Sequence, residues 1–195
     1  MNQALLTYKF KHIPTIETER LILRPMKVSD FEDMYDYAKR EDLTRYLLWS
    51  PHPSAAYSKE FLKFVVKRYR AGVFFDWGIE EKESGRMIGT CGFTAIDVDN
   101  RTGEIGYVIN PDFQRRGYAP EAAKAVLSFG FSELELNRVE SKFMRENEAS
   151  LSVMKKLGMT FEGYLRDSMY VKGEYRTIGV CSILKKEFFD SSSNN

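Results

Sequence analysis

The chain has 195 residues, of which 43% are hydrophobic and 29% are charged, and its formal net charge is +1. Such a chain is long enough for one domain with a substantial core, and its composition is ordinary for a globular protein. The balanced charge, the absence of a membrane-length apolar run and the absence of a signal-peptide pattern favour a cytoplasmic protein that binds neither nucleic acid nor a membrane.

Cysteine and histidine are too few and too scattered to predict a structural metal site. Cys91 and Cys181 each stand alone in strand-like sequence, which is typical of small buried side chains in a reducing compartment. His12 and His52 lie near prolines in loop-like sequence. We therefore expect neither a disulfide nor a bound metal.

The first part of the chain combines one strand pattern with two helix patterns. Residues 20–24 (RLILR) predict a strand, and residues 29–40 predict a helix whose apolar side chains recur at helical spacing. A break rich in aromatic residues and prolines covers 46–57. A basic amphipathic helix is then expected over 58–70, with its charged side chains in solvent.

A β meander is predicted next, with strands over 74–80, 87–96 and 104–109 joined by polar turns. The last of these strands leads into a helical pattern that begins near Ala119, with Pro120 close to its first position. This helix keeps one apolar face throughout.

The remaining elements are a strand over 138–144, a helix over 149–157 and two strands that pair across Lys172-Gly173. The predicted order of elements is therefore a strand, helices, a meander, a helix, a strand, a helix and a hairpin. This order predicts an α+β fold, in which a mixed and mostly antiparallel sheet is flanked by helices on both faces.

No repeat and no long linker divides the chain, which favours a single domain. We expect that domain over residues 15–188. An N-terminal extension over residues 1–14 would precede it, and a disordered tail over residues 189–195 would follow.

The turn between the third meander strand and the next helix is the most informative segment. It reads Gln114-Arg115-Arg116-Gly117-Tyr118-Ala119. A glycine-bearing turn that opens a helix exposes unpaired N–H groups and the positive end of the helix dipole, which suits a phosphate or pyrophosphate. The spacing fits neither a P-loop nor a dinucleotide fingerprint. The alternative is a plain turn in which Gly117 supplies an unusual backbone angle.

The pattern Gln/Arg-x-x-Gly-x-Gly/Ala resembles the acyl-CoA pyrophosphate loop of the GNAT superfamily of N-acyltransferases. Further segments are similar to the RimJ/RimL branch, the ribosomal-protein N-terminal acetyltransferases: TERLILRP (18–25), WGI (77–79), IG (88–89), EIGY (104–107), NEAS (147–150), KLGM (156–159) and FEG (161–163). The resemblance covers about residues 15 to 188 and implies the GNAT fold, with acetyl-CoA as cosubstrate and no metal.

The resemblance implies how acetyl-CoA would be held. The backbone amides of Gln114 to Ala119 would bind the pyrophosphate. Tyr107, Val108 and Ile109 would line the pantetheine through backbone hydrogen bonds, and one of their N–H groups would face the thioester oxygen. Arg115 and Arg116 either add charge near the CoA phosphates or are solvated, and we expect direct contact from at most one of them.

Two catalytic residues follow from the same resemblance. Glu104 is the candidate general base, acting through water; the alternative is a surface carboxylate on a strand. Many GNAT enzymes protonate the CoA thiolate with a tyrosine where this chain has Met154, which cannot donate a proton. Ser150 is the candidate replacement, and Asn147 would hydrogen-bond the cofactor or a water. Both residues are also good helix caps.

The acceptor end of the site departs from the resemblance. Thr177 and Cys181 stand in the closing hairpin where many relatives carry an aspartate and a tyrosine, and this difference concerns the acceptor more than the cofactor. The aromatic segment over 46–57 either shapes an acceptor groove or covers the core.

Three functions are compatible with these residues. The leading one is acetyl transfer, by direct attack in a ternary complex, to the N-terminal α-amine of a protein, plausibly a ribosomal one. A second keeps this chemistry with a small amine as acceptor, such as a polyamine, an amino acid or an aminoglycoside-like amine, for which the acidic residues between Asp30 and Asp42 supply some carboxylates. A third is a CoA-binding module without turnover, suggested by Met154. A homodimer is left open.

Overall fold

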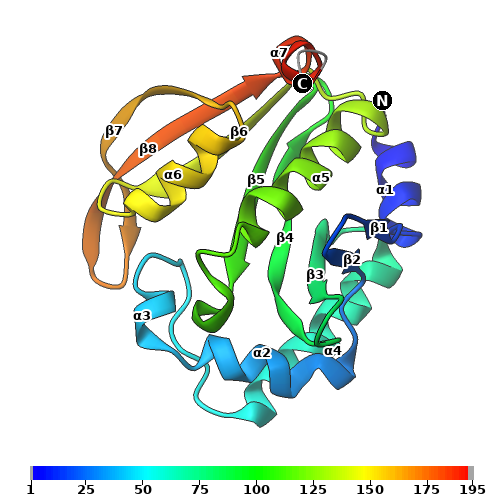
Figure 1. Cartoon of the computed structure of the whole chain (residues 1–195), viewed down its shortest axis with the longest axis vertical. Coiled ribbons are helices and arrows are strands. Elements are labelled where there is room, and N and C mark those ends of the chain that lie inside the picture. The colour runs from blue at the N-terminus through cyan, green and yellow to red at the C-terminus, as the bar shows by residue number, and fades with distance from the viewer. Residues whose placement is uncertain (1, 193–195) are drawn as a thin grey trace.

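One eight-stranded sheet runs through the molecule in the order β1-β2-β3-β4-β5-β6-β8-β7 (Figure 1). The structure, a computed structural model, describes residues 2–192. Every neighbouring pair of strands is antiparallel except β5 and β6, which are parallel. The strands are β1 Ile16–Glu17, β2 Leu21–Arg24, β3 Asp76–Glu81, β4 Met87–Asp97, β5 Thr102–Ile109, β6 Arg138–Met144, β7 Thr160–Val171 and β8 Glu174–Leu184.

Helices cover both faces of this sheet, as predicted. Helices α5 and α6 contact each other on one face, whereas α2 and α4 pack together on the other. The helical elements are α1 Gln3–Lys11, η1 Val28–Asp30, α2 Phe31–Ala38, α3 Glu41–Thr44, α4 Ala55–Ala71, η2 Pro111–Phe113, α5 Tyr118–Ser132, α6 Glu148–Lys156 and α7 Lys185–Ser192. Within residues 2–192, no helix is both long enough and apolar enough to cross a membrane.

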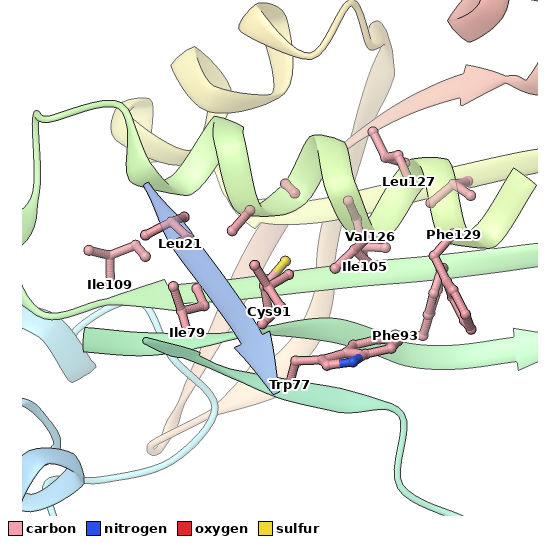
Figure 2. Packing of buried hydrophobic residues seen from close by; sticks show 14 of the residues in the cluster. Leu21, Trp77, Ile79, Cys91, Phe93, Ile105, Ile109, Val126, Leu127 and Phe129 are labelled. Carbon is pink, nitrogen blue, oxygen red and sulfur yellow. The ribbon is translucent and has the colours of Figure 1, made fainter. Parts of the chain in front are cut away.

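The main hydrophobic core lies between α5 and the central strands (Figure 2). The apolar face of α5, including Val126 and Leu127, meets Ile105 of β5 and the strands beside it, and these three side chains are buried. Trp77 of β3 is fully buried at one end of this core. Its ring meets Phe129 of α5 at 5.3 Å, and its Nε1 donates a hydrogen bond to a loop carbonyl at 2.8 Å. The core therefore fixes β3, β4 and β5 against α5.

Strands β5 and β6 separate after a short stretch of pairing. Only three residue pairs join them, from Thr102 with Arg138 to Glu104 with Glu140. Beyond these pairs, side chains of β6 make the links: the Ser141 hydroxyl donates to the Ile105 carbonyl at 3.0 Å, and the Lys142 ammonium lies 2.6 Å from the Glu104 carboxylate. Strand β6 instead pairs along its whole length with β8. The far half of β5 is consequently left with one unpaired backbone edge.

The sequence-based fold class is confirmed, but the N-terminal segment differs from the expectation. Most of the predicted extension over 1–14 forms helix α1, in which Leu6 and Phe10 are buried. The Phe10 ring lies 4.5 Å from that of Phe75 and 5.8 Å from that of Trp77. Helix α1 is thus part of the core. The short strand β1, which follows it, was also not predicted.

The predicted disordered tail over 189–195 needs a correction. Residues 189–192 belong to α7, in which the ring of Phe189 packs 6.5 Å from that of Phe131. Aromatic contact with α5 gives this short helix an apolar side to bury. Residues 193–195 lie outside the described part of the chain.

Two internal boundaries also differ from the expectation. The single helix expected over 29–40 is divided into η1 and α2. The short helix α3 follows α2 and precedes the aromatic segment over 46–57. Helix α4 begins before residue 58, because Ser54 caps it through the N–H of Tyr57 at 3.2 Å.

We predict that Phe10→Ala lowers the free energy of unfolding by about 3–5 kcal/mol, because it removes a fully buried ring and leaves a cavity. Urea denaturation measures this change. Tyr8→Ala on the same helix is the control, because Tyr8 is 63% exposed, and it should change stability little. Equal effects of the two substitutions would contradict the assignment of α1 to the core.

Candidate active site

The Gln114–Ala119 turn has the geometry of an anion site. Gly117 caps the N-terminus of α5 with φ +84°, and Arg115 is also left-handed at φ +62°. The N–H groups of residues 115–119 have no hydrogen-bond partner within the described part of the chain. Pro120 follows them in the first turn and has no N–H. Several donors and the positive helix end therefore converge where a pyrophosphate can bind.

Contacts from several elements hold this turn in place. Arg20 of the β1–β2 connection donates to the Arg116 carbonyl at 2.8 Å and pairs with Glu121 at 2.6 Å. The Gln114 side chain donates to the Ile109 carbonyl at 3.0 Å. The Tyr118 hydroxyl donates a short hydrogen bond to Glu81, and this bond raises the pKa of Tyr118. The Gln114 and Tyr118 side chains are thus structural, while the backbone N–H groups remain for a ligand.

The two arginines of the turn differ in their surroundings. Arg116 donates to the Asp112 carbonyl at 2.9 Å, and its guanidinium lies 5.1 Å from the centre of the Phe113 ring. Arg115 is exposed. Arg115 is therefore the arginine better placed to move toward a bound phosphate.

Strand register decides which backbone groups of β5 face the gap beside β6. The Asn110 N–H bonds the Ile88 carbonyl on β4, whereas the Ile105 carbonyl bonds Ser141 on β6. Because backbone groups alternate along a strand, those of Tyr107 and Ile109 point to the gap, and those of Val108 point to β4. Of the three predicted pantetheine contacts, Val108 is thus placed to contribute its side chain only.

A cleft opens beside the separated strands, with lining side chains from α4 on one face of the sheet and from α6 on the other. Its larger cavity, of about 670 Å³, lies between β4, β5 and β6 and includes Glu104, Tyr107, Asn147 and Ser150 in its lining. A smaller cavity, of about 430 Å³, adjoins it. Both are lined by Trp49, Phe74, Asp76, Thr90 and Val108. A β-bulge at Thr94 shifts the pairing of β4 and β5 next to Glu104.

Glu104 lies on the wall of the larger cavity with both carboxylate oxygens occupied. Its Oε2 is 2.6 Å from the Lys142 ammonium, and its Oε1 accepts a hydrogen bond from the Thr94 hydroxyl at 2.8 Å. The hydrogen bond to Glu104 raises the pKa of Lys142. The Glu104 carboxylate therefore lies in the cleft. A catalytic water would bind this carboxylate beside Lys142 and the Thr94 hydroxyl.

Asn147 caps α6, whereas Ser150 lies inside the first turn of that helix, and both residues line the larger cavity. The Asn147 side chain accepts from the Ser150 N–H at 3.2 Å. The Ser150 hydroxyl lies 3.1 Å from the Tyr107 hydroxyl, which also donates to the Ser150 carbonyl. Burial raises the pKa of Tyr107. The structure thus pairs two hydroxyl groups here, and Tyr107 lines the cavity with its phenol, whereas only its backbone was expected to contribute.

Only some of the side chains expected at the acceptor end line the cleft. Tyr46, Leu47, Leu48 and Trp49 line the larger cavity, so this part of the aromatic segment faces the cleft. Thr177 and Cys181 line neither cavity, and Cys181 is buried.

Asp76 was missed in the sequence, although it lines both cavities. No local motif marks it. Its position in the site depends on the pairing of β3 with β4.

The fold and the site define an acyl-CoA-binding protein of the acetyltransferase class, and comparison with known proteins agrees. Residues 20–160 match the family model described as acetyltransferase (GNAT) domain. The chain therefore belongs to the GNAT acetyltransferase family, and the predicted likeness to its RimJ/RimL-like branch is confirmed.

Relatives with similar sequences are N-acetyltransferases. The uncharacterized N-acetyltransferase YoaA of Bacillus subtilis is 36% identical over 172 residues, which cover 88% of this chain and 97% of YoaA. "Putative ribosomal N-acetyltransferase YdaF" of Bacillus subtilis is 29% identical over 180 residues, 87% of this chain and 94% of YdaF. Spermidine N(1)-acetyltransferase of Escherichia coli (strain K12) is 25% identical over 162 residues, 79% of this chain and 80% of the relative.

A solved GNAT acetyltransferase from Bacillus anthracis superposes with a TM-score of 0.79 at 28% identity, covering 89% of this chain and 99% of that one. The chain is thus an enzyme of the acyltransferase type that uses acetyl-CoA to acetylate an amine. Within residues 2–192, no three His, Cys, Asp or Glu side chains are grouped as metal ligands would be.

We predict that Gly117→Ala weakens CoA binding by about fivefold or more, because a Cβ at φ +84° costs roughly 1–2 kcal/mol and would lie 3.2 Å from Arg20 Nη2. Isothermal titration with CoA measures the change. Gly85→Ala is the matched control, because Gly85 has φ +67° and a Cβ there meets nothing within 4 Å. If both variants bind CoA as the parent does, the turn is not the pyrophosphate site.

Proposed function

We propose that this protein transfers the acetyl group of acetyl-CoA to the α-amine of a protein N-terminus, with ribosomal proteins as the leading acceptors. The observation that carries the proposal is the unpaired edge of β5, which connects the anion site at Gly117 with the open cleft between β5 and β6. The similarity to YdaF supports a ribosomal acceptor. An extended chain end can enter such an open cleft from solvent.

The cofactor would lie along the β5 edge. In this proposal the N–H groups of residues 115–119 hold the pyrophosphate, and the backbone groups of Tyr107 and the N–H of Ile109 hold the pantetheine. The thioester then lies near the start of the gap, beside Asn147 and Ser150. Glu104 accepts a proton through water as the amide forms, and the Ser150–Tyr107 hydroxyl pair supplies a proton to the CoA thiolate.

Direct attack in a ternary complex is supported by the residues around the cleft. Neither cysteine lines the two cavities, and burial raises the pKa of the Cys91 thiol well above its usual range. The Ser141 hydroxyl is already bonded to the Ile105 carbonyl. A covalent acetyl-enzyme would need an activated nucleophile in the cleft, and these side chains do not provide one.

A small amine is the alternative acceptor, and the similarity to spermidine N(1)-acetyltransferase supports it. Several of the acidic residues expected to favour such an acceptor are engaged with arginines. Asp30 pairs with Arg24 at 2.9 Å, and Asp33 and Asp36 both pair with Arg86. This arrangement favours the protein N-terminus over a polyamine, since a polyamine needs several free carboxylates.

A CoA-binding module without turnover is the third candidate, and it was motivated by Met154. This side chain is fully buried in the core and lines neither cavity. The Ser150–Tyr107 pair offers another proton source, so the loss of a tyrosine at residue 154 does not require loss of activity.

Mass spectrometry of acceptors incubated with the protein and acetyl-CoA tests the proposal. We expect acetylation of the α-amine in N-terminal peptides of ribosomal proteins, with spermidine and aminoglycosides modified less. Product on the small amines alone would replace the leading acceptor by the alternative. CoA binding without product on any acceptor would favour the module without turnover.

We predict that Glu104→Gln lowers kcat by about 10²-fold or more, because the amide cannot accept the proton, while CoA affinity stays unchanged. Steady-state kinetics and calorimetry with CoA measure the two effects. Glu83→Gln in the exposed β3–β4 turn is the control and should behave as the parent. An active Glu104→Gln enzyme would remove Glu104 from the mechanism.

A further inference from the structure

Asp76, at the start of β3, stands in one row with two glycines across the sheet. Asp76 pairs with Gly92 of β4, and Gly92 pairs with Gly106 of β5. Directly paired residues present their side chains on the same face of a sheet, so Asp76 shares the cleft face with Glu104 and Val108. The row leads from Asp76 to the part of β5 that borders the gap.

The two glycines keep this row open. A Cβ on Gly92 would lie 2.7 Å from Asp76 Oδ1 and 2.3 Å from the Phe75 carbonyl oxygen, so only glycine lets the carboxylate lie over β4. A Cβ on Gly106 would meet only Thr94 Cγ2 within 4 Å, at 3.1 Å. Neighbouring strands are about 4.8 Å apart. The carboxylate therefore lies roughly one strand spacing from the β5 edge.

Asp76 also lacks the partners that a buried carboxylate usually has. Its Oδ1 is shielded from solvent and has no hydrogen-bond partner within the described residues. The Thr90 hydroxyl and the Trp77 N–H lie near enough to favour the charged form, but burial outweighs them. An unpaired carboxylate in such a place is costly unless a ligand completes it.

Other charged and titratable groups around the cleft do not neutralise Asp76. On α4, Arg68 donates to the Val73 carbonyl at 2.9 Å, and the Tyr69 hydroxyl donates to the Asp76 backbone carbonyl at 2.6 Å. Across the cleft, Lys142 is paired with Glu104. The remaining titratable side chains that line the two cavities are tyrosines and one histidine: Tyr37, Tyr46, Tyr57, Tyr107 and His52.

The smaller cavity beside Asp76 is aromatic and otherwise uncharged. Its rings come from α2, α4 and the segments before β3: Tyr37, Trp49, His52, Tyr57, Phe61 and Phe74. His52 Nδ1 lies 2.8 Å from the Ser58 hydroxyl, and burial lowers the pKa of His52, so the imidazole is neutral near pH 7. Aromatic faces and one carboxylate suit a single ammonium group on an apolar body. A second cation, a carboxylate or a phosphate would find no opposite charge there.

We propose that Asp76 binds the acceptor as its ammonium ion, with the apolar group next to the amine in the smaller cavity. Asp76 then takes one proton, so that the neutral nitrogen attacks the thioester carbon. The C–S bond breaks, the leaving thiolate takes a proton from the Ser150–Tyr107 hydroxyl pair, and the nitrogen loses its second proton through water to Glu104 as the amide forms. Protonated Asp76 returns its proton to solvent. This inference rests on the proposed acetyltransferase function and specifies its acceptor as a monoamine, such as an uncharged N-terminal residue.

The pH dependence follows from the same site. Burial raises the pKa of Asp76 to about 7, so kcat/KM should rise with pH as Asp76 loses its proton. The free energy of unfolding should change in the opposite direction to kcat/KM, falling as pH rises. The folded state holds this proton up to about pH 7, whereas an unfolded aspartate loses it near pH 4. Asp76 therefore makes the fold less stable as pH rises through this window.

We predict that Asp76→Asn lowers the affinity of the CoA-bound protein for 2-phenylethylamine by about tenfold or more, since a charge-assisted hydrogen bond is lost. Calorimetry with 2-phenylethylamine and with 2-phenylethanol, its uncharged counterpart, measures this. The affinities for 2-phenylethanol and CoA should not change. Asp99→Asn in the exposed β4–β5 turn is the matched control.

Two further measurements separate a substrate role from a merely structural one. Asp76→Asn should lose the rise of kcat/KM near pH 7, and its melting temperature should exceed that of the parent at pH 8 but not at pH 4. Unchanged amine affinity in Asp76→Asn, or tighter binding of spermidine than of 2-phenylethylamine by the parent, would overturn the inference.

The proposed function can fail separately. A protein that binds 2-phenylethylamine through Asp76 but acetylates no acceptor would contradict the transferase proposal and support the amine site. The opposite result is that the parent protein acetylates peptides and the Asp76→Asn variant has the same kcat/KM and the same pH profile. That result would support the transferase proposal and contradict the amine site at Asp76.

Discussion

The separation of β5 and β6 after three parallel pairs is the constraint on which the site depends. Each strand is held by a different partner: β5 by β4 and the core under α5, and β6 by β8 along seven residue pairs. Neither strand can move to close the gap without losing these contacts. The far half of β5 therefore keeps polar backbone groups without a strand partner, and a ligand that supplies hydrogen bonds along that edge is favoured.

The charges around the cleft are arranged so that little is left unpaired. Arg24 pairs with both Asp30 and Glu80. The Arg24 guanidinium is half-buried between these two carboxylates, so the three side chains have a structural role. Arg86, just before β4, forms ion pairs with Asp33 and Asp36 of α2. Asp33 also accepts a hydrogen bond from the N–H of Met87, the first residue of β4. Asp76 is the exception to this pairing. A fold that pairs the carboxylates beside Arg24 and Arg86 but leaves one oxygen of Asp76 without a partner gives up some stability at that position, which is typical of sites under functional constraint.

Local sequence features predicted the parts of the protein that depend on neighbouring residues. The glycine turn, the meander and the final hairpin each follow from turn chemistry and short-range periodicity, and they formed as expected. Features that depend on strand pairing were not accessible. The partner of Glu104 is Lys142, 38 residues away, and only register distinguishes the backbone of Val108 from that of Tyr107 and Ile109. Asp76 was missed for the same reason, since β3 meets the site only through β4.

Helix α1 was missed for a different reason, namely its weak pattern. Its nine residues mix apolar and basic side chains, and only Leu6 and Phe10 are buried. So short a helix is marginal in isolation and forms because Phe10 enters the aromatic cluster around Trp77. Tertiary contact, rather than local preference, determines this element.

The hydroxyl pair of Tyr107 and Ser150 depends on the capping of α6 by Asn147. Asn147 and Ser150 fix the first turn of α6, and that turn holds the Ser150 hydroxyl against the phenol of β5 across the gap. Met154, one turn further on, is thereby free to serve as a core residue. A proton donor at Tyr107 belongs to the same strand as the proposed pantetheine contacts, so cofactor and acid would be positioned together. A donor at residue 154 would instead depend on how α6 packs on the sheet.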